Sequence, residues 1–573
     1  MTAQSADQGP EAGLSDAAEA ASALDMLLSD AALGIARRFR PDGAALRFAL
    51  GLARRPRTVA GRAASLAAEL GSVAAGRSAI APARRDRRFA DQAWTSNPVL
   101  SRTVQAYLAL AGTAEMLVAD AGLDWRDGER MRFVLSNLID AAAPSNNPLI
   151  SPVAWKAVID SGGLSVLRGL RALASDLSAP PRVPAMVTPD AFEVGRDLAA
   201  TPGAVVARSE VCELIQYEPV TATVYQFPLL VVPPMINKFY ITDLAPGRSM
   251  IEYLVSQGHQ VFAISWRNPD ARHRDWDTDT YGAAVADALG AVRSICQAPQ
   301  ASISALCSGG MTAAMVAAHL SGAGRLTELA TLCLGVTVLD QAQAGTAGAM
   351  IGERTAALAI AASQARGYLD GRSLAEVFAW LRPNDLIWNY WVNNYLQGQP
   401  PPPFDILYWN ADTTRLPAAV HRDFIKLALA NALTRPGAAT MLGSPVDLSK
   451  VDIDSYVVAG IADHLCPWQS CYRAAALLGG STRFVLSPSG HIASMVNPPS
   501  NPKATFQTGP GDDNPADPAD WLRAAQTVPG SWWPDYSAWL GDRSGARQQR
   551  PGQLGNADYP PLQAAPGSYV LDR

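Results

Sequence analysis

The chain has little charge for its length. Only 17% of its 573 residues are Asp, Glu, Lys or Arg, whereas 48% are hydrophobic. The formal net charge of −5 argues against nucleic-acid binding. No stretch approaches the ~20 consecutive apolar residues that a membrane-spanning helix needs. The first 24 residues lack the basic and apolar regions of a signal peptide. We therefore expect a protein without a transmembrane segment.

Cysteine is also scarce. The six cysteines show neither a Cys-x-x-Cys pair nor the spacing of metal ligands, so we expect no metal site and no disulfide framework. Several lie in apolar runs, which is typical of buried thiols in a reducing cytoplasm. They are Cys212, Cys296, Cys307, Cys333, Cys466 and Cys471.

One cysteine has a distinctive context. Cys307 ends the β-rich run Ala-Ser-Ile-Ser-Ala-Leu at 301–306, and Ser308, Gly309 and Gly310 follow before an Ala-rich helical stretch. This pattern is typical of a nucleophile elbow, a strained strand-to-helix turn that exposes the nucleophile at a helix N-terminus. Serine is usual there. A cysteine at this position indicates a reaction on thioesters in place of ester hydrolysis. The helix N-terminus also favours the thiolate and offers N–H groups to an oxyanion.

The chain divides into three predicted regions. Residues 1–30 are expected to be a disordered tail and 31–195 a mostly helical N-terminal domain. Residues 31–62 hold eight arginines against the single acid Asp42, with apolar residues between them. Two interpretations stay open for this segment: a basic amphipathic helix lying on an anionic or apolar surface, or an Arg-rich helix packed on its neighbours.

From 196 to 573 we expect an α/β catalytic domain. β-rich runs at 225–232, 260–266, 302–306, 329–334, 455–458 and 483–486 alternate with helical ones, which predicts a mostly parallel, doubly wound sheet. A helical, aromatic segment at about 340–440 interrupts this order. Its position after the strand that follows the Cys307 helix favours a cap over the cysteine; a plain helical packing layer is the alternative.

A thiol nucleophile needs a base, and the chain has only six histidines. His491 follows a β-rich run in a Ser-Pro-Ser-Gly-His loop, and Asp463 ends the run before it. The order Cys307, Asp463, His491 is that of the nucleophile, acid and base of an α/β-hydrolase fold. His464 is the competing base, but it adjoins Asp463, so we assign it a supporting, substrate-contacting place. His259, His273, His319 and His421 lack such a context.

At these residues the chain resembles the polyhydroxyalkanoate (PHA) synthases, and most closely resembles their single-subunit, medium-chain class. The resemblance covers about 90–573. It rests on Pro-Pro-Met-Ile-Asn-Lys-Phe-Tyr at 233–240, Ser-Trp-Arg-Asn-Pro at 265–269, the Cys307 motif, and the long runs 382–396, 404–417, 462–464 and 489–492. Ala305 replaces the glycine that is usual in the family motif, and we expect activity to survive this change.

The resemblance implies an α/β-hydrolase fold with a helical cap and an acyltransferase that polymerises 3-hydroxyacyl-CoA. CoA enters as part of the substrate, and no other cofactor is implied. The N–H groups of Ser308 and Ile236 would hold the oxyanion. Asp463 would orient His491 or help to activate the 3-hydroxyl of the incoming monomer. Arg382 would contact CoA; a surface ion pair is its alternative.

The resemblance also implies a homodimer on the surface of cytoplasmic PHA granules, alongside phasin-type granule proteins. Two other functions remain as alternatives. A thioesterase or PHA depolymerase would use the same triad, although a thiol nucleophile and a shielding cap argue against hydrolysis. A non-catalytic granule-coat protein would suit the basic N-terminal segment, but it would leave the triad without a purpose.

Overall fold

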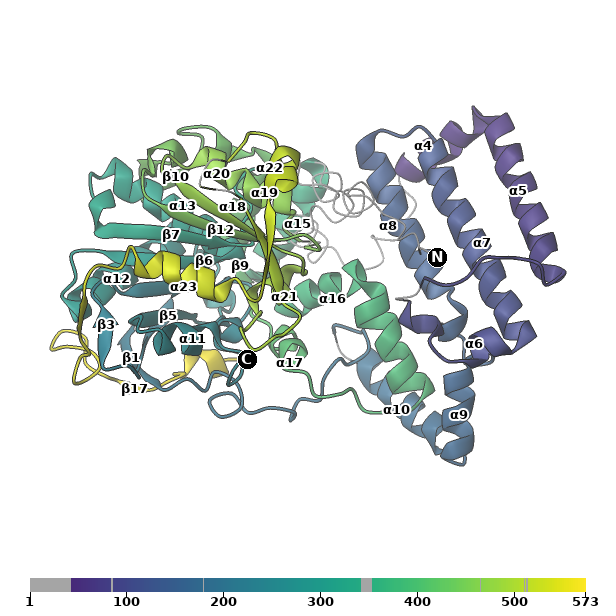
Figure 1. Ribbon diagram of the computed structural model, residues 1–573, viewed down its shortest axis with the longest axis horizontal. Helices are drawn as coiled ribbons and strands as arrows, with labels where there is room; N and C mark the ends of the chain where they lie inside the picture. Colours follow the sequence, from purple (N-terminus) through teal and green to yellow (C-terminus); the bar gives the residue numbers. More distant parts are fainter. Residues whose placement is uncertain are drawn as a thin grey trace, which may run out of the picture. The chain divides into compact units, whose positions relative to one another are not determined.

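The computed structural model describes residues 43–573 except 84–85, 179, 342–352, 464, 510 and 512–513. The predicted tail at 1–30 lies outside the described residues. The chain forms two compact units, both drawn in Figure 1. The larger contains Asp190–Gly371 and Phe404–Arg573. The described part of the smaller runs from residue 43 to Pro189 and includes Arg372–Pro403.

The larger unit is built on a sheet that has eleven strands in the described chain. Six central strands are parallel, and antiparallel strands extend both edges. In sheet order they are β15 (Gln526–Pro529), β14 (Thr505–Thr508), β13 (Thr482–Ser487), β12 (Ser455–Gly460), β7 (Leu329–Gly335), β6 (Ala301–Leu306), β4 (Leu229–Val232), β5 (Val261–Trp266), β2 (Cys212–Tyr217), β1 (Gly203–Arg208) and β17 (Gln563–Ala564).

Burial explains why the central strands read as continuous apolar runs. Every residue of β4, β5, β6 and β12 is buried, as expected where helices cover both faces of a parallel sheet. Each predicted run from 260 onwards falls on one of the six parallel strands. The run at 225–232 does not form one strand: β3 (Thr223–Tyr225) pairs with β16 (Arg547–Gln549), and β4 begins after Pro228. Proline has no N–H for a central ladder, so it separates the two.

Helices cover both faces of the sheet (Figure 1). On one face α12 (Thr278–Cys296) packs beside α13 (Cys307–Gly322). On the other, α11 (Met250–Ser256) contacts α23 (Trp533–Gly541) through the rings of Tyr253 and Trp533. Nearly all of α13 is buried, which is why its sequence is apolar on every side. The larger unit thus has the predicted α/β-hydrolase type of architecture.

The chain turns back at one place in the sheet, and this position matters for function. From β4 it crosses to β5 on one side and then returns to β6 on the other side of β4. The carboxyl ends of β4 and β6 therefore flank a topological switch point, where open α/β sheets bind ligands. Cys307 follows β6 directly, and the loop with Ile236 follows β4.

The C-terminal segment closes the far edge of the sheet. β17 pairs with β1, and the turn after it bonds to the buried carboxylate of Glu213, which accepts the N–H groups of Ser568 and Tyr569 at 3.0 Å. Lys238, in the loop after β4, donates from Nζ to the backbone carbonyl of Asp572 at 2.5 Å. The last residues are therefore tied to the loop that carries Ile236.

The predicted cap at 340–440 is divided between the two units. Helices α15 (Glu353–Arg366), α17 (Asp405–Ala411) and α18 (Ala418–Leu429) belong to the larger unit. Arg372–Pro403, which includes most of α16 (Gly371–Leu381) and the wide helical turns Asn384–Trp388 and Trp391–Leu396, belongs to the smaller unit. That this segment covers the cysteine stays a prediction.

The smaller unit is helical. α5 packs on α7 and α4 on α8, and the turn Trp391–Leu396 packs on α10. Arginines of α4 and α5 pair with these neighbours: Arg47 binds Asp127, and Arg62 Nε lies 2.7 Å from Asp120 Oδ2. The contacts of Arg47 and Arg62 agree with the packed-helix interpretation, and binding of this segment to a surface stays a prediction. The helices are α4 (Gly43–Ala53), α5 (Pro56–Ala74), α6 (Ala93–Ser96), α7 (Pro98–Asp120), α8 (Trp125–Ala141), α9 (Pro152–Asp160) and α10 (Leu164–Ser178).

None of the helices in the described ranges is long and apolar enough to cross a membrane.

Close packing at the start of α13 explains the glycines there. A Cβ on Gly309 would lie 2.4 Å from the carbonyl oxygen of Pro233, and one on Gly310 would lie 2.0 Å from Thr337 Oγ1. Neither distance is sterically allowed. The helix can approach the loop after β4 only because these positions carry no side chain.

We therefore expect Gly309→Ala to destabilise the larger unit by about 1–3 kcal/mol, since a backbone oxygen cannot move aside as a flexible side chain can. Gly290→Ala is the matched control, because position 290 is exposed on α12 and a Cβ there meets nothing within 4 Å; the change should be neutral or stabilise by about 0.5–1 kcal/mol. Urea unfolding followed by circular dichroism measures both. Equal stability of the two variants would contradict the packing argument.

Candidate active site

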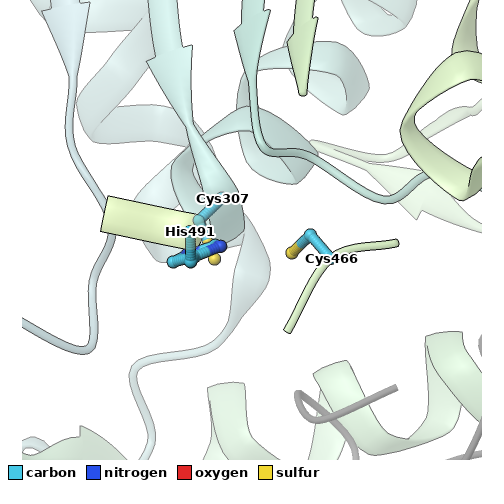
Figure 2. Close-up of side chains that lie close together, drawn as sticks. All are labelled: Cys307, Cys466 and His491. Carbon is cyan, nitrogen blue, oxygen red and sulfur yellow. The ribbon is translucent and has the colours of Figure 1, made fainter. Parts of the chain in front are cut away.

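Cys307 occupies a strained backbone position at the end of β6. Its φ is 50°, in the left-handed region that residues other than glycine rarely adopt. The strand stops at Leu306, and α13 begins at Cys307 itself. Figure 2 shows the side chain leaving this junction towards His491. The residue is 7% exposed. This is the geometry of a nucleophile elbow, as the motif predicts.

Asp463 and His491 reach the same place from two neighbouring strands. Asp463 follows β12 and His491 begins α21 (His491–Met495) after β13, and these strands are parallel, so their carboxyl ends lie side by side. His491 Nδ1 lies 2.8 Å from Asp463 Oδ2. The other carboxylate oxygen accepts the N–H groups of Leu465 at 2.8 Å and Cys466 at 2.9 Å. Three hydrogen bonds thus fix the carboxylate. Asp463 contacts Nδ1 of His491, so the other ring nitrogen, Nε2, is available to a different partner.

A third side chain joins the pair. Cys307 Sγ, Cys466 Sγ and a ring nitrogen of His491 all lie within 4.8 Å of one another, and all three residues are buried. In Figure 2 the Cys466 thiol comes from a separate loop and points towards the other two. The structure therefore brings together the three residues predicted as a triad and adds a second sulfur.

The surroundings of Cys307 favour its thiolate. A hydrogen bond from Cys466, together with His491 and the N–H of Ser308, outweighs burial and lowers the pKa of Cys307 from 9.0 to about 5. For His491, burial alone would lower the pKa, but the Asp463 carboxylate and the Cys307 sulfur overcome it and raise the pKa to about 10. Both shifts favour a thiolate on Cys307 beside an imidazolium on His491.

Cys466 keeps its proton. Its hydrogen bond to Cys307, and then its burial, raise its pKa well above the ordinary 9.0, so it acts as the donor of the two thiols. The sequence analysis grouped this residue with ordinary buried thiols and missed it. Its place three residues after Asp463, the acid that follows β12, was the available signal, because the turn that fixes Asp463 also carries Cys466.

The two predicted oxyanion donors lie on either side of the elbow. Ser308 is the second residue of α13, and its Oγ accepts the backbone N–H of Met235 at 3.2 Å. Val232 at the end of β4 is in register with Ala305 of β6, so the loop with buried Ile236 leaves the sheet next to Cys307. Thr414 Oγ1 holds this loop by donating to the Met235 carbonyl at 3.0 Å. Ala305 itself is fully buried.

Arg382 and His464 are the predicted substrate contacts. Arg382 belongs to the smaller unit and forms an exposed ion pair with Asp385, which agrees with the alternative interpretation of that arginine. Its contact with CoA stays a prediction. His464 lies outside the described residues.

The remaining four histidines have other partners. They pair through ring nitrogens with Ser537 (His259, 3.1 Å), Asp270 (His273, 3.1 Å), Ser444 (His319, 2.9 Å) and Ser363 (His421, 2.8 Å). Elimination from the sequence had set the same four aside.

Comparison with known proteins agrees with this geometry. The family described as "alpha/beta hydrolase fold" matches residues 238–498, which defines the class of the larger unit. The family "Poly-beta-hydroxybutyrate polymerase (PhaC) N-terminus" matches residues 85–254.

Two curated relatives extend the match over most of the chain. Poly(3-hydroxyalkanoate) polymerase 2 of Ectopseudomonas oleovorans is 46% identical over 520 residues, covering 91% of this chain and 92% of the relative. Poly(3-hydroxyalkanoate) polymerase subunit PhaC of Cupriavidus necator is 40% identical, covering 85% and 83% respectively. The chain belongs to the poly(3-hydroxyalkanoate) polymerase family.

The ion pair predicts an unusual pH dependence of thiol alkylation. Iodoacetamide should modify Cys307 at a nearly constant rate between pH 6 and 8 and more slowly below about pH 5, where the thiolate is protonated. His491→Gln removes the imidazolium and raises the pKa of Cys307, so alkylation at pH 6 should fall about tenfold or more. Mass spectrometry of the peptide that contains Cys307 gives the rates.

His319→Gln is the control, because His319 lies on the same helix but bonds to Ser444. It should leave the profile of Cys307 unchanged. An unaltered profile in His491→Gln would show that the imidazole does not act on this sulfur.

Proposed function

We propose that the chain polymerises 3-hydroxyacyl-CoA into polyester, with Cys307 as the residue that carries the growing acyl chain. The observation that carries this proposal is a cysteine at an elbow, beside a histidine that a buried aspartate orients, in a chain 46% identical to a poly(3-hydroxyalkanoate) polymerase. The pairing supplies a nucleophile and a proton carrier for acyl transfer from a thioester.

In the loading step, the Cys307 thiolate attacks the thioester carbonyl and forms a tetrahedral oxyanion. The N–H groups of Ser308 and Ile236 stabilise that oxygen. The intermediate then breaks its bond to the CoA sulfur, and the departing CoA takes the proton of the His491 imidazolium. The products are an acyl-thioester on Cys307, free CoA and a neutral His491.

Neutral His491 is then the base for elongation. It takes the proton of the 3-hydroxyl of the next monomer, whose oxygen attacks the acyl group on Cys307. An oxygen–carbon bond forms, the carbon–sulfur bond breaks, and the thiolate and imidazolium are restored. The extended chain, now a CoA thioester, reloads onto Cys307 by the first step. Asp463 orients the imidazole in both directions; direct help to the hydroxyl is its alternative role.

Sulfur and burial both favour transfer to an alcohol over hydrolysis. A thioester stays activated for transfer, whereas an oxoester on serine would be a poorer donor. Cys307 and His491 are each 7% exposed and Asp463 is 1% exposed, so little water reaches the acyl group. Hydrolysis is the second candidate because the fold is shared with hydrolases. Soluble 3-hydroxy acid as the main product would favour it; insoluble polymer favours the polymerase.

We also propose that the smaller unit works at a polymer surface. Helices α9 and α10 and the turn before α9 expose large apolar side chains, including Leu149 in the turn at 75%, Ile159 at 74% and Leu167 at 65%. Such a surface suits the coat of a PHA granule, or the homodimer and phasin-type partners that the family implies. Preference for medium-chain monomers belongs to the same proposal.

Replacement of Cys307 tests the carrier role. Cys307→Ala should abolish CoA release from 3-hydroxyacyl-CoA, and Cys307→Ser should retain at most a trace, because a serine ester is a poor donor to the next hydroxyl. Thiol titration of CoA together with gravimetry of polymer measures both. Cys296→Ser, a change at the end of α12, is the matched control and should keep activity. Vigorous polymerisation by Cys307→Ser would contradict the mechanism.

Surface binding can be separated from catalysis. The double change Leu167→Gln and Leu170→Gln removes two exposed apolar side chains from α10, and we expect its binding to PHA particles to weaken by about tenfold or more. CoA release from soluble substrate should persist. Arg168→Gln, also on the exposed side of this helix, is the control. Sedimentation with purified granules gives the bound fraction, and unchanged binding of the double variant would exclude this surface.

A further inference from the structure

The second thiol at the active site donates a hydrogen bond to Cys307 but neither forms a bond to substrate nor transfers a proton in the proposed reaction. Cys466 lies within 4.8 Å of both the Cys307 sulfur and the His491 nitrogen, and the three residues are buried. They arrive on three separate segments: the start of α13, the loop after β12 and the start of α21. Figure 2 shows the two sulfurs and the imidazole directed into a common space.

This donor set suits a thiophilic metal ion. Two sulfurs and one imidazole nitrogen are the ligands that Zn²⁺, Co²⁺ and Cd²⁺ prefer, whereas Mg²⁺ and Ca²⁺ require oxygen. The His491 nitrogen bound to Asp463 leaves the other nitrogen as the ligand. A carboxylate behind a histidine is the usual support of a ligating imidazole, because it fixes the ring and its tautomer.

The three candidate ligand atoms lie slightly farther apart than the ligands of a bound zinc ion. Ligands of a tetrahedral zinc site lie about 3.5–3.8 Å apart, given Zn–S and Zn–N bonds of about 2.3 and 2.0 Å. The three atoms here lie within 4.8 Å of one another, so an approach of about 1 Å brings them to three corners of a tetrahedron. The fourth corner is left for water.

We propose that Cys307, Cys466 and His491 form a binding site for one zinc-like ion, and that the bound ion blocks the nucleophile. Binding converts both sulfurs to thiolates and leaves His491 neutral, which releases the Cys466 proton and the proton shared by Cys307 and His491. The binding site itself does not depend on the polymerase reaction. Only the inhibition does, and that part rests on the proposed function.

One consequence distinguishes this site from general poisoning by metals. A Cys307 sulfur that carries an acyl group is a thioester and no longer offers a thiolate. Metal and acyl chain therefore exclude each other on the same atom. Zinc should block the loading of free enzyme strongly and enzyme already carrying polymer weakly.

Binding can be measured without any turnover. Purified full-length protein in a phosphine reductant is titrated with Co²⁺, and sulfur-to-cobalt absorption is followed; Zn²⁺ then displaces the cobalt. We expect one ion per chain and protection of Cys307 from iodoacetamide. Cys466→Ser keeps a hydrogen-bond donor but loses the soft ligand, so its affinity should fall by about 100-fold or more. Cys296→Ser, a thiol remote in the fold, should bind as the unaltered chain does.

The outcomes separate the two proposals. Wild-type affinity in Cys466→Ser, no cobalt–sulfur absorption in the unaltered chain, or undiminished alkylation of Cys307 in the presence of zinc would each overturn the metal site. Metal binding in a protein that releases no CoA from 3-hydroxyacyl-CoA would instead overturn the proposed function and leave the site standing. Equal inhibition by Mg²⁺ would also count against the site, because Mg²⁺ does not select thiolates.

Discussion

The left-handed backbone at Cys307 is the constraint on which the rest of the site depends. A φ of 50° is unfavourable for cysteine, and it persists because the surrounding packing allows no other path. β6 is buried on both faces, α13 is buried almost throughout, and Gly309 and Gly310 lie against the loop after β4 and against Thr337. The strain is thereby stored where it directs one sulfur out of the sheet.

The same packing makes the electrostatics possible. A buried thiolate and a buried imidazolium are each costly to remove from water, and they persist only when hydrogen bonds compensate them. Here Asp463 is held by two N–H groups and holds His491 in turn, while Cys307 accepts from Cys466 and Ser308. Every member of the chain of contacts is anchored at the carboxyl end of a strand. The sheet thus brings Cys307, Asp463 and His491 together, and the turn around Asp463 places Cys466.

Much of this arrangement follows from the order of residues along the chain. Cys307, Asp463 and His491 could be predicted because each ends or follows an apolar run, and the ends of parallel strands converge. Cys466 could not, since its approach to Cys307 depends on how one turn folds around Asp463. The edge strands β14, β15 and β17 were also missed, because short antiparallel strands at an edge carry mixed polar sequences. Pro228 indicated that 225–232 contains parts of two strands, and the prediction of a single run did not take it into account.

The contacts of the C-terminal segment form only after the rest of the described chain has been synthesised. β17 closes the sheet edge beside β1, and the carbonyl of Asp572 holds Lys238, which lies two residues from Ile236. On the ribosome these residues emerge after all the others described. A nascent chain therefore carries its cysteine, aspartate and histidine before Asp572 can hold Lys238, so the loop beside them gains this anchor only late in synthesis.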